Sequence, residues 1–189
     1  MKIARYNKPF KQGNPYAYRS GMGLFSNVQR NPEVRRIRQF ERPKYWRGWE
    51  ESAEIFKPVV QYDDFESQVA ALVNQERAKE GLPGLQLDSY ISEVARIKAQ
   101  DLRDRRYFNH QSPTYGSPFE MMETFGINYS YAGENIAKGQ KSPQVVMDGW
   151  MGSPGHKDNI LNKHYKEIGV GFVKDTGDTT YWVQLFVAR

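Results

Sequence analysis

The chain has 189 residues with a formal net charge of +5, and 39% of its residues are hydrophobic and 14% aromatic. That length allows one ordinary domain with an appended segment, or two small domains. The absence of cysteine excludes disulfides, thiolate metal sites and cysteine nucleophiles, and no apolar run approaches the roughly 20 residues of a membrane-spanning helix.

Charge divides the chain near residue 60. Residues 1–60 hold 13 Lys/Arg and 5 Asp/Glu, a net charge of +8, whereas residues 61–189 hold 14 and 17, a net charge of −3. Glycines and prolines in residues 1–60 are spaced so closely that we expect no long helix or strand there, apart from a short helix near residues 32–42. We therefore expect a basic, aromatic-rich extended arm over residues 1–60 and a folded domain over residues 61–189.

The arm interleaves aromatic rings with arginines, a pattern that suits two functions. Such a segment can dock on a protein surface, or it can stack on bases beside phosphate-binding cations. We favour docking on protein partners over a disordered tail, and we disfavour nucleic acid. The N-terminus contains no apolar core of a secretory signal peptide, so we expect no such signal in this sequence.

The folded domain begins with two predicted helices. Asp63 or Asp64 is expected to cap a helix that runs to about Glu80, and Gly81 is expected to end it. A second helix is predicted after Asp88, with residues of its inner face at three- and four-residue spacing. These face residues are Ile91, Val94, Ala95, Lys98 and Leu102.

Two further helix starts and a hairpin complete the predicted elements. The run Ser117-Pro118-Phe119-Glu120 is typical of a capping box, with Gly126 as the stop, and Ser142-Pro143 predicts another helix. The runs EIGVGFVKD and TTYWVQLFVAR, joined at 176–178, predict an antiparallel hairpin. Helices that flank a small antiparallel sheet predict an α+β domain.

Three polar residues are candidates for chemistry because they lie in glycine- or proline-punctuated runs that we expect to be loops. His110 lies in YFNHQSP, Glu134 in YAGENIA and His156 in MGSPGHKDNIL. Two imidazoles and a carboxylate could hold a divalent cation such as zinc, or they could act as acid and base around a bound water. The sequence contains no HExxH, GxSxG or GxxxxGK[ST] motif, and we expect His164, among polar neighbours, to be a surface residue.

The segments YFNHQSPTYGSPFEMM, YAGENIA and DGWMGSPGHKDNILNKHYKEIGVGF resemble the bacterial branch of the CAP superfamily, also called SCP-like or pathogenesis-related-1-like. The resemblance covers residues 64–189 approximately, and nothing comparable is found for residues 1–60. It implies a three-layer α–β–α sandwich with a small antiparallel sheet, here preceded by an extended N-terminal arm.

The resemblance also implies a cleft that two histidines and two glutamates line, and that holds a divalent cation in many members. His110, Glu134 and His156 match three of these residues, with Asn135 next to Glu134 in the GEN motif. Ser153 occupies the position of the second glutamate. One anionic ligand fewer implies a weakened cation site of low occupancy.

Members of this superfamily are mostly secreted and have been linked to lipid or sterol binding, to defence and, in some cases, to proteolysis, so the fold does not fix the chemistry. We favour a non-catalytic binding or structural module, anchored by residues 1–60 in an extracellular or particle-associated assembly such as a cell envelope, spore or virus particle. Its cleft would take a small apolar ligand or a polymer. The alternative is a metal-assisted hydrolase that acts on peptide or cell-wall polymer through His110, Glu134 and His156.

Overall fold

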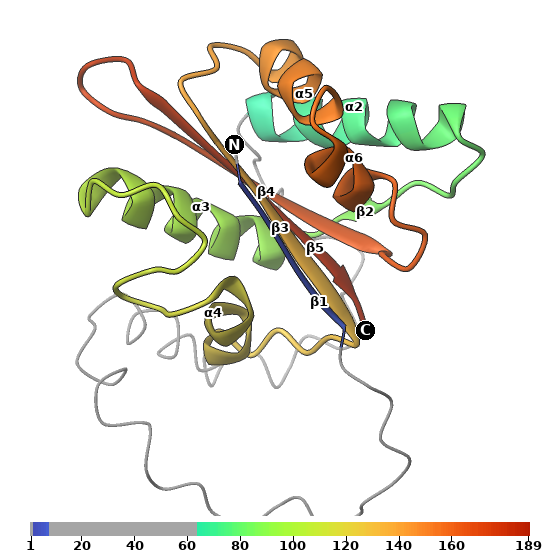
Figure 1. Cartoon of the computed structure of the whole chain (residues 1–189), viewed down its shortest axis with the longest axis horizontal. Coiled ribbons are helices and arrows are strands. Elements are labelled where there is room, and N and C mark those ends of the chain that lie inside the picture. Colours follow the sequence, from blue (N-terminus) through green and yellow to red (C-terminus); the bar gives the residue numbers. More distant parts are fainter. Residues whose placement is uncertain (1, 8–63) are drawn as a thin grey trace, which may run out of the picture. The chain divides into compact units, whose positions relative to one another are not determined.

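The computed structural model describes residues 2–7 and 64–189, which belong to one compact unit (Figure 1). In chain order the elements are β1 (Lys2–Asn7), α2 (Asp64–Lys79), β2 (Gln86–Leu87), α3 (Ser89–Asp104), α4 (Pro118–Thr124), β3 (Tyr131–Lys138), α5 (Pro143–Met151), α6 (Pro154–Ile160), β4 (Glu167–Lys174) and β5 (Thr180–Ala188). The helix expected near residues 32–42 lies outside the described residues. No helix among those described is long and apolar enough to cross a membrane.

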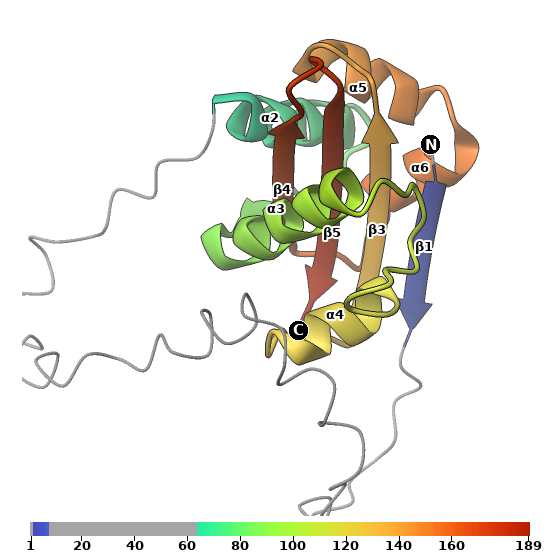
Figure 2. The ribbon, with the colours of Figure 1, turned by 90° about the vertical axis from the view of Figure 1, so that its left-hand side faces the viewer.

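A five-stranded sheet in the order β1-β3-β5-β4-β2 forms the middle layer. Every neighbouring pair is antiparallel except β2 and β4. Helices α3 and α4 cover one face, and α2, α5 and α6 cover the other (Figures 1 and 2). The predicted three-layer α–β–α sandwich is thereby confirmed.

Local signals at the helix ends agree with the prediction. The Asp88 carboxylate accepts a hydrogen bond from the Ile91 amide at 2.8 Å and so caps α3. After α2, Gly81 adopts a positive φ of 68°, the left-handed conformation that favours glycine, and the Leu82 amide donates back to the Arg77 carbonyl at 2.9 Å. The hairpin of β4 and β5 also forms as expected.

The main core lies between the sheet and the layer of α2, α5 and α6. Every residue of β5 is buried, since this strand is central in the sheet and covered on both faces. The largest side chains that fill this core are Trp150, Tyr165, Trp182 and Phe186. Burial of such aromatic and aliphatic surface supplies the main favourable term for folding.

The structure differs from the expected elements at two strands. We expected the YAGENIA run to be a glycine-punctuated loop, but it lies within β3, between β1 and β5. We also expected an extended arm without a long strand over residues 1–60, whereas Lys2–Asn7 pairs with β3 as an edge strand of the domain. Both strands were missed because the polar pair Glu134-Asn135 interrupts the apolar pattern of β3, and β1 is joined to the sheet through backbone hydrogen bonds that its sequence does not signal.

Two of the three serine-proline pairs that begin helices in the described residues differ in their caps, which gives a matched prediction. The Ser117 hydroxyl accepts from the Glu120 amide and the Glu120 carboxylate accepts from the Ser117 amide, a complete capping box, whereas Ser153 makes no side-chain capping bond. Replacement of Ser117 by alanine is expected to lower the free energy of unfolding by about 1 kcal/mol. Ser153→Ala is expected to leave it unchanged. Urea unfolding of the two variants checks this, and equal losses would contradict it.

Candidate functional site

The structure brings two of the predicted site residues into direct contact. Glu134 lies in the middle of β3 and is completely buried. His110 lies in the loop between α3 and α4, and its Nδ1 is 2.5 Å from the Glu134 Oε1, while 14% of the imidazole side chain stays exposed. The other polar atoms, Glu134 Oε2 and His110 Nε2, have no hydrogen-bond partner among the described residues. The pair therefore joins a loop to the sheet and retains one unused polar atom on each side chain.

A buried lysine holds the backbone of the His110 loop. Lys98 lies on the inner face of α3 and is completely buried. Its ammonium donates to the carbonyls of Asn109 and His110, at 3.2 and 2.9 Å, and to the Tyr107 hydroxyl at 3.0 Å. Because the ammonium binds the carbonyl of His110 itself, the position of the imidazole is coupled to helix α3.

The carboxylate of Asp101, one turn further along α3, fixes the rest of this loop. It accepts hydrogen bonds from the Ser112 hydroxyl at 2.7 Å, from the Thr114 hydroxyl at 2.6 Å and from the Tyr107 hydroxyl. A buried polar network of this kind is stable when each member has a partner. Residues 107–114 are thus fastened to α3 on both sides of His110.

The network shifts two pKa values. Burial lowers the pKa of the Lys98 ammonium from its ordinary value, although the nearby carboxylates of Glu134 and Asp101 act in the opposite direction. Burial, followed by the hydrogen bond to Asp101, raises the pKa of Tyr107 far above its ordinary value. The phenol is therefore held in its neutral, hydrogen-bonding form.

The Tyr107 shift predicts a pH dependence of stability. Above about pH 10 the tyrosine of the unfolded chain ionises while folded Tyr107 keeps its proton, so the folded state binds more protons and its stability falls as the pH rises. The stability advantage of the wild type over Tyr107→Phe should therefore shrink between pH 9 and about pH 11. Urea unfolding of both proteins across this range checks the sign. An advantage that stays constant or grows would contradict it.

Asn135, next to Glu134, connects β3 to the opposite layer. Its amide donates to the His156 carbonyl at 3.2 Å and to the Gln184 side chain at 3.0 Å. Asn159 of α6 donates to the Asn135 side chain at 2.9 Å and to the Glu134 carbonyl at 3.2 Å. These buried amides fix α6 against the middle of the sheet, so the GEN segment has a structural role beside the His110–Glu134 pair.

His156 takes part in this amide network through its backbone carbonyl, and Ser153 precedes it at the start of α6. His156 is in α6 and is buried to 3% exposure, and Ser153 precedes the helix as its half-buried N-cap residue. Within residues 2–7 and 64–189, no group of three or more His, Cys, Asp or Glu side chains is placed to hold a metal ion. The expected set of His110, Glu134 and His156 is therefore not assembled as a cation site in this part of the chain, where the Glu134 carboxylate is bonded to the His110 imidazole. The residues present do not fit a three-ligand cation site.

Several residues of the site were not identified as such from the sequence. Lys98 appeared only as a member of the α3 face, and a lysine at an inner position of an amphipathic helix is itself a signal, since buried lysine is rare unless paired. Asp101, Tyr107 and Asn159 gave no comparable signal, because their partners are distant in sequence. His164 is exposed as expected, and its ring stacks on Tyr131 at 4.3 Å between centroids.

Chemically, the His110–Glu134 pair can accept and donate hydrogen bonds from fixed positions. A carboxylate bonded to one ring nitrogen selects the tautomer and the orientation of an imidazole. The pair could therefore recognise a polar group of a ligand, or it could serve as an oriented base. Because the Lys98 and Asp101 bonds fix the His110 loop in place, we favour recognition of a ligand over base catalysis.

The comparison with known proteins places these features in a family. Residues 70–186 match the model of the CAP, or cysteine-rich secretory protein, family. The uncharacterized protein YkwD of Bacillus subtilis is 53% identical over 125 residues, which are 66% of this chain and 48% of that protein. Another B. subtilis relative, the uncharacterized membrane protein YlbC, is 36% identical over 66% of this chain and 34% of its own. The chain thus spans about half or less of the length of these curated relatives.

Solved structures give the same result for the fold. An extracellular protein of Bacillus anthracis that contains an SCP domain superposes with a TM-score of 0.61 at 32% identity, over 66% of this chain and 40% of that one. An outer surface protein of Borrelia burgdorferi also gives a TM-score of 0.61, at 23% identity, over 68% of this chain and 98% of its own. Structural relatives thus include an extracellular protein and an outer surface protein.

Proposed function

Because the chain belongs to the CAP, or cysteine-rich secretory protein, family, we propose that it is a non-catalytic binding module of an extracellular or surface-associated assembly. Similarity to an extracellular SCP-domain protein supports the location. In this proposal the surface around His110 and Glu134 binds the ligand, and residues 1–60 attach the domain to protein partners. The ligand class that we favour is a cell-envelope polymer.

The observation that carries this proposal is the buried His110–Glu134 pair. Glu134 is completely buried, yet its Oε2 has no hydrogen-bond partner among the described residues, and neither has His110 Nε2. A buried polar atom without a partner costs free energy, and a ligand that displaces the groups covering it recovers that cost by bonding to it. The Lys98 and Asp101 bonds hold this pair in place before any ligand binds, which lowers the entropy cost of binding.

The arrangement gives less support to hydrolysis. A metal-assisted mechanism needs an ion with several protein ligands, and the described residues do not assemble such a group. The Ser112 hydroxyl, adjacent to the His110 loop, donates to Asp101 and accepts from the amides of Thr114 and Tyr115. That serine is therefore committed to the loop structure. One feature favours the hydrolase alternative: a carboxylate that orients an imidazole is also the arrangement of a general base.

The binding role of the pair is tested by co-sedimentation with purified peptidoglycan from which the attached anionic polymers have been removed. Glu134→Gln keeps the size of the side chain but removes its charge, and His110→Gln removes the imidazole. Each variant is expected to bind about tenfold or more weakly, the cost of about one lost charge-assisted hydrogen bond. Glu93→Gln, an exposed position of α3, is the matched control. Binding by all three variants at the wild-type level would overturn the assignment of the site.

The docking role of residues 1–60 rests on their sequence, since residues 8–63 lie outside the described part. Deletion of the whole segment is not a clean test, because Lys2–Asn7 pairs with β3. Serine replacements of Trp46 and Trp49 leave that strand intact. We expect the double variant to lose capture of envelope proteins in a crosslinking pull-down while its far-UV circular dichroism is unchanged. Unaltered capture would count against docking through these aromatic residues.

A further inference from the structure

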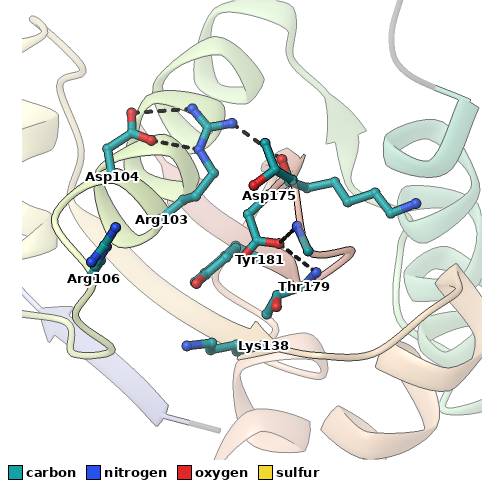
Figure 3. Close-up of a pocket in the computed structure, with 10 residues that line it drawn as sticks. Arg103, Asp104, Arg106, Lys138, Asp175, Thr179 and Tyr181 are labelled. Atoms are coloured by element: carbon teal, nitrogen blue, oxygen red, sulfur yellow. Dashed lines mark hydrogen bonds and ion pairs between the residues drawn. The ribbon is translucent and has the colours of Figure 1, made fainter.

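A polar hollow at one end of the sheet lies apart from the His110–Glu134 pair. The carboxyl-terminal ends of α3 and β3 and the turn between β4 and β5 surround it (Figure 3). Lys138, in its wall, is four residues after Glu134 on β3, so the two positions are about 13 Å apart along the strand. The volume of the hollow is about 760 Å³, which is in the range of small-molecule sites.

Four cationic side chains and two carboxylates line this hollow, so that its formal charge is positive. Arg103, Arg106, Lys138 and Lys174 supply the positive charge, and Asp104 and Asp175 supply the negative charge. Both carboxylates already have partners. Asp104 binds the Arg103 guanidinium at 2.6 Å, and Asp175 accepts from the amides of Gly177 and Thr179, each at 2.8 Å.

Two of the cations, Arg106 and Lys138, form no close ion pair in the described part of the chain, although hydrogen bonds and, to a smaller extent, the charge of Lys138 lower the pKa of the Asp175 carboxyl. Lys174 pairs with Asp178 at 2.7 Å and Arg103 pairs with Asp104, but no ion pair is formed there by Arg106 or Lys138. Lys138 instead lies over the Tyr181 ring, 5.0 Å from its centroid. Figure 3 shows both side chains at the hollow without a bond to the other residues drawn.

The backbone of Arg106 gives a second, independent indication. Arg106 follows the last residues of α3 and adopts a positive φ of 54°. Its amide donates to the Arg103 carbonyl and the Tyr107 amide donates to the Leu102 carbonyl, a helix-ending arrangement in which glycine is usual. An arginine in the left-handed conformation is less favourable than glycine, and such strain is frequent where a side chain has a function. An arginine is thus present at the hollow although its backbone conformation there is less favourable than it would be for glycine.

We propose that this hollow binds a phosphodiester segment of an anionic polymer, through Arg106 and Lys138. A guanidinium and an ammonium can each bind a phosphate group, the first through two parallel hydrogen bonds and the second as a point charge. Tyr181 lines the same hollow, and its hydroxyl can donate to a phosphate oxygen. The volume is far larger than one phosphate ion needs, so the hollow fits a polymer segment better than a free ion.

The test measures binding of poly(glycerol phosphate) to the full chain by titration calorimetry and by the shifts of amide NMR signals. Because residues 1–60 are themselves basic, the shifts of Gly177 and Thr179 report binding at the hollow. The double variant Arg106→Gly/Lys138→Gln should bind about tenfold or more weakly and with a smaller salt dependence. Arg106→Gly also relieves the positive φ, so misfolding is not expected to account for the loss. Lys163→Gln, an exposed position that precedes β4 at the opposite end of that strand, should bind as the wild type does.

Inorganic phosphate and poly-L-glutamate are the comparison ligands. The proposal predicts that both bind more weakly than poly(glycerol phosphate). Equal affinity for inorganic phosphate would reduce the hollow to a site for a single ion, and equal affinity for poly-L-glutamate would mean that only charge is recognised. Either result would overturn the proposal. It would also be overturned if the double variant bound like the wild type, or if the polymer bound without shifting the amide signals of Gly177 and Thr179. None of these outcomes depends on His110 or Glu134.

Discussion

Gly171→Ala is expected to lower the free energy of unfolding by about 3 kcal/mol, a large fraction of the stability of a domain of this size. Helix α3 lies directly against β4 at this position. A methyl group at residue 171 would lie 2.2 Å from the carbonyl carbon of Ala95 and 2.4 Å from the Arg96 nitrogen. These are backbone atoms, so no side-chain rotation relieves the overlap, and α3 must move away from the sheet. Urea unfolding monitored by tryptophan fluorescence measures the loss.

Gly177→Ala is the matched control for that variant. Gly177 lies in the turn between β4 and β5, where an added methyl group would meet only the Asp175 side chain, at an ordinary contact distance of 3.4 Å. Its amide, which donates to Asp175, is retained in alanine. We expect a change within about 0.5 kcal/mol. Similar losses at residues 171 and 177 would show that close packing of α3 on β4 is not the cause.

Lys98→Met is expected to lower the free energy of unfolding by about 3 kcal/mol and to weaken ligand binding at the His110–Glu134 pair. Methionine fills a similar volume but cannot donate to the Tyr107 hydroxyl or to the carbonyls of Asn109 and His110. These acceptors would be left without their partner, and the His110 loop would lose its connection to α3. Urea unfolding and the co-sedimentation assay measure the two effects.

Lys79→Met is the control for the loss of a lysine. Lys79 also makes a 2.6 Å ion pair, with Glu76, but its side chain is 67% exposed. Exposed pairs contribute about 0–1 kcal/mol, so little change is expected. If Lys98→Met were as stable as Lys79→Met and bound ligand normally, the bonds of Lys98 would not be what positions His110.

The elements that the sequence predicts well are those with local signals. The caps at Asp88, Ser117 and Ser142 and the glycine stop at Gly81 are contained within a few neighbouring residues. Helices α2, α3, α4 and α5 begin close to the predicted positions, and α2 and α4 also end close to their predicted glycine stops. The strand β3 was missed for a physical reason. Its polar residues Glu134 and Asn135 are buried because partners from distant segments satisfy them, and a local pattern contains no information about those partners.

The same distinction applies to the candidate site. Motif resemblance selected His110, Glu134 and His156, but it could not indicate which of them touch, because 24 residues separate the first two and contact depends on the path of the loop after α3. The bonds from Lys98 and Asp101 determine that path. Ser153, at the position of the missing glutamate, begins α6 without a side-chain cap. Its role as a cleft residue stays a prediction.

The most direct test of the central claim, binding without catalysis at the His110–Glu134 pair, is a turnover measurement. Peptidoglycan and casein are incubated with the full chain, with and without zinc, and the products are followed by mass spectrometry while the bound protein is quantified by sedimentation. The claim predicts that the protein sediments with peptidoglycan and that both substrates stay intact. Fragments that accumulate with the wild type and disappear with Glu134→Gln would contradict it and would establish the hydrolase alternative.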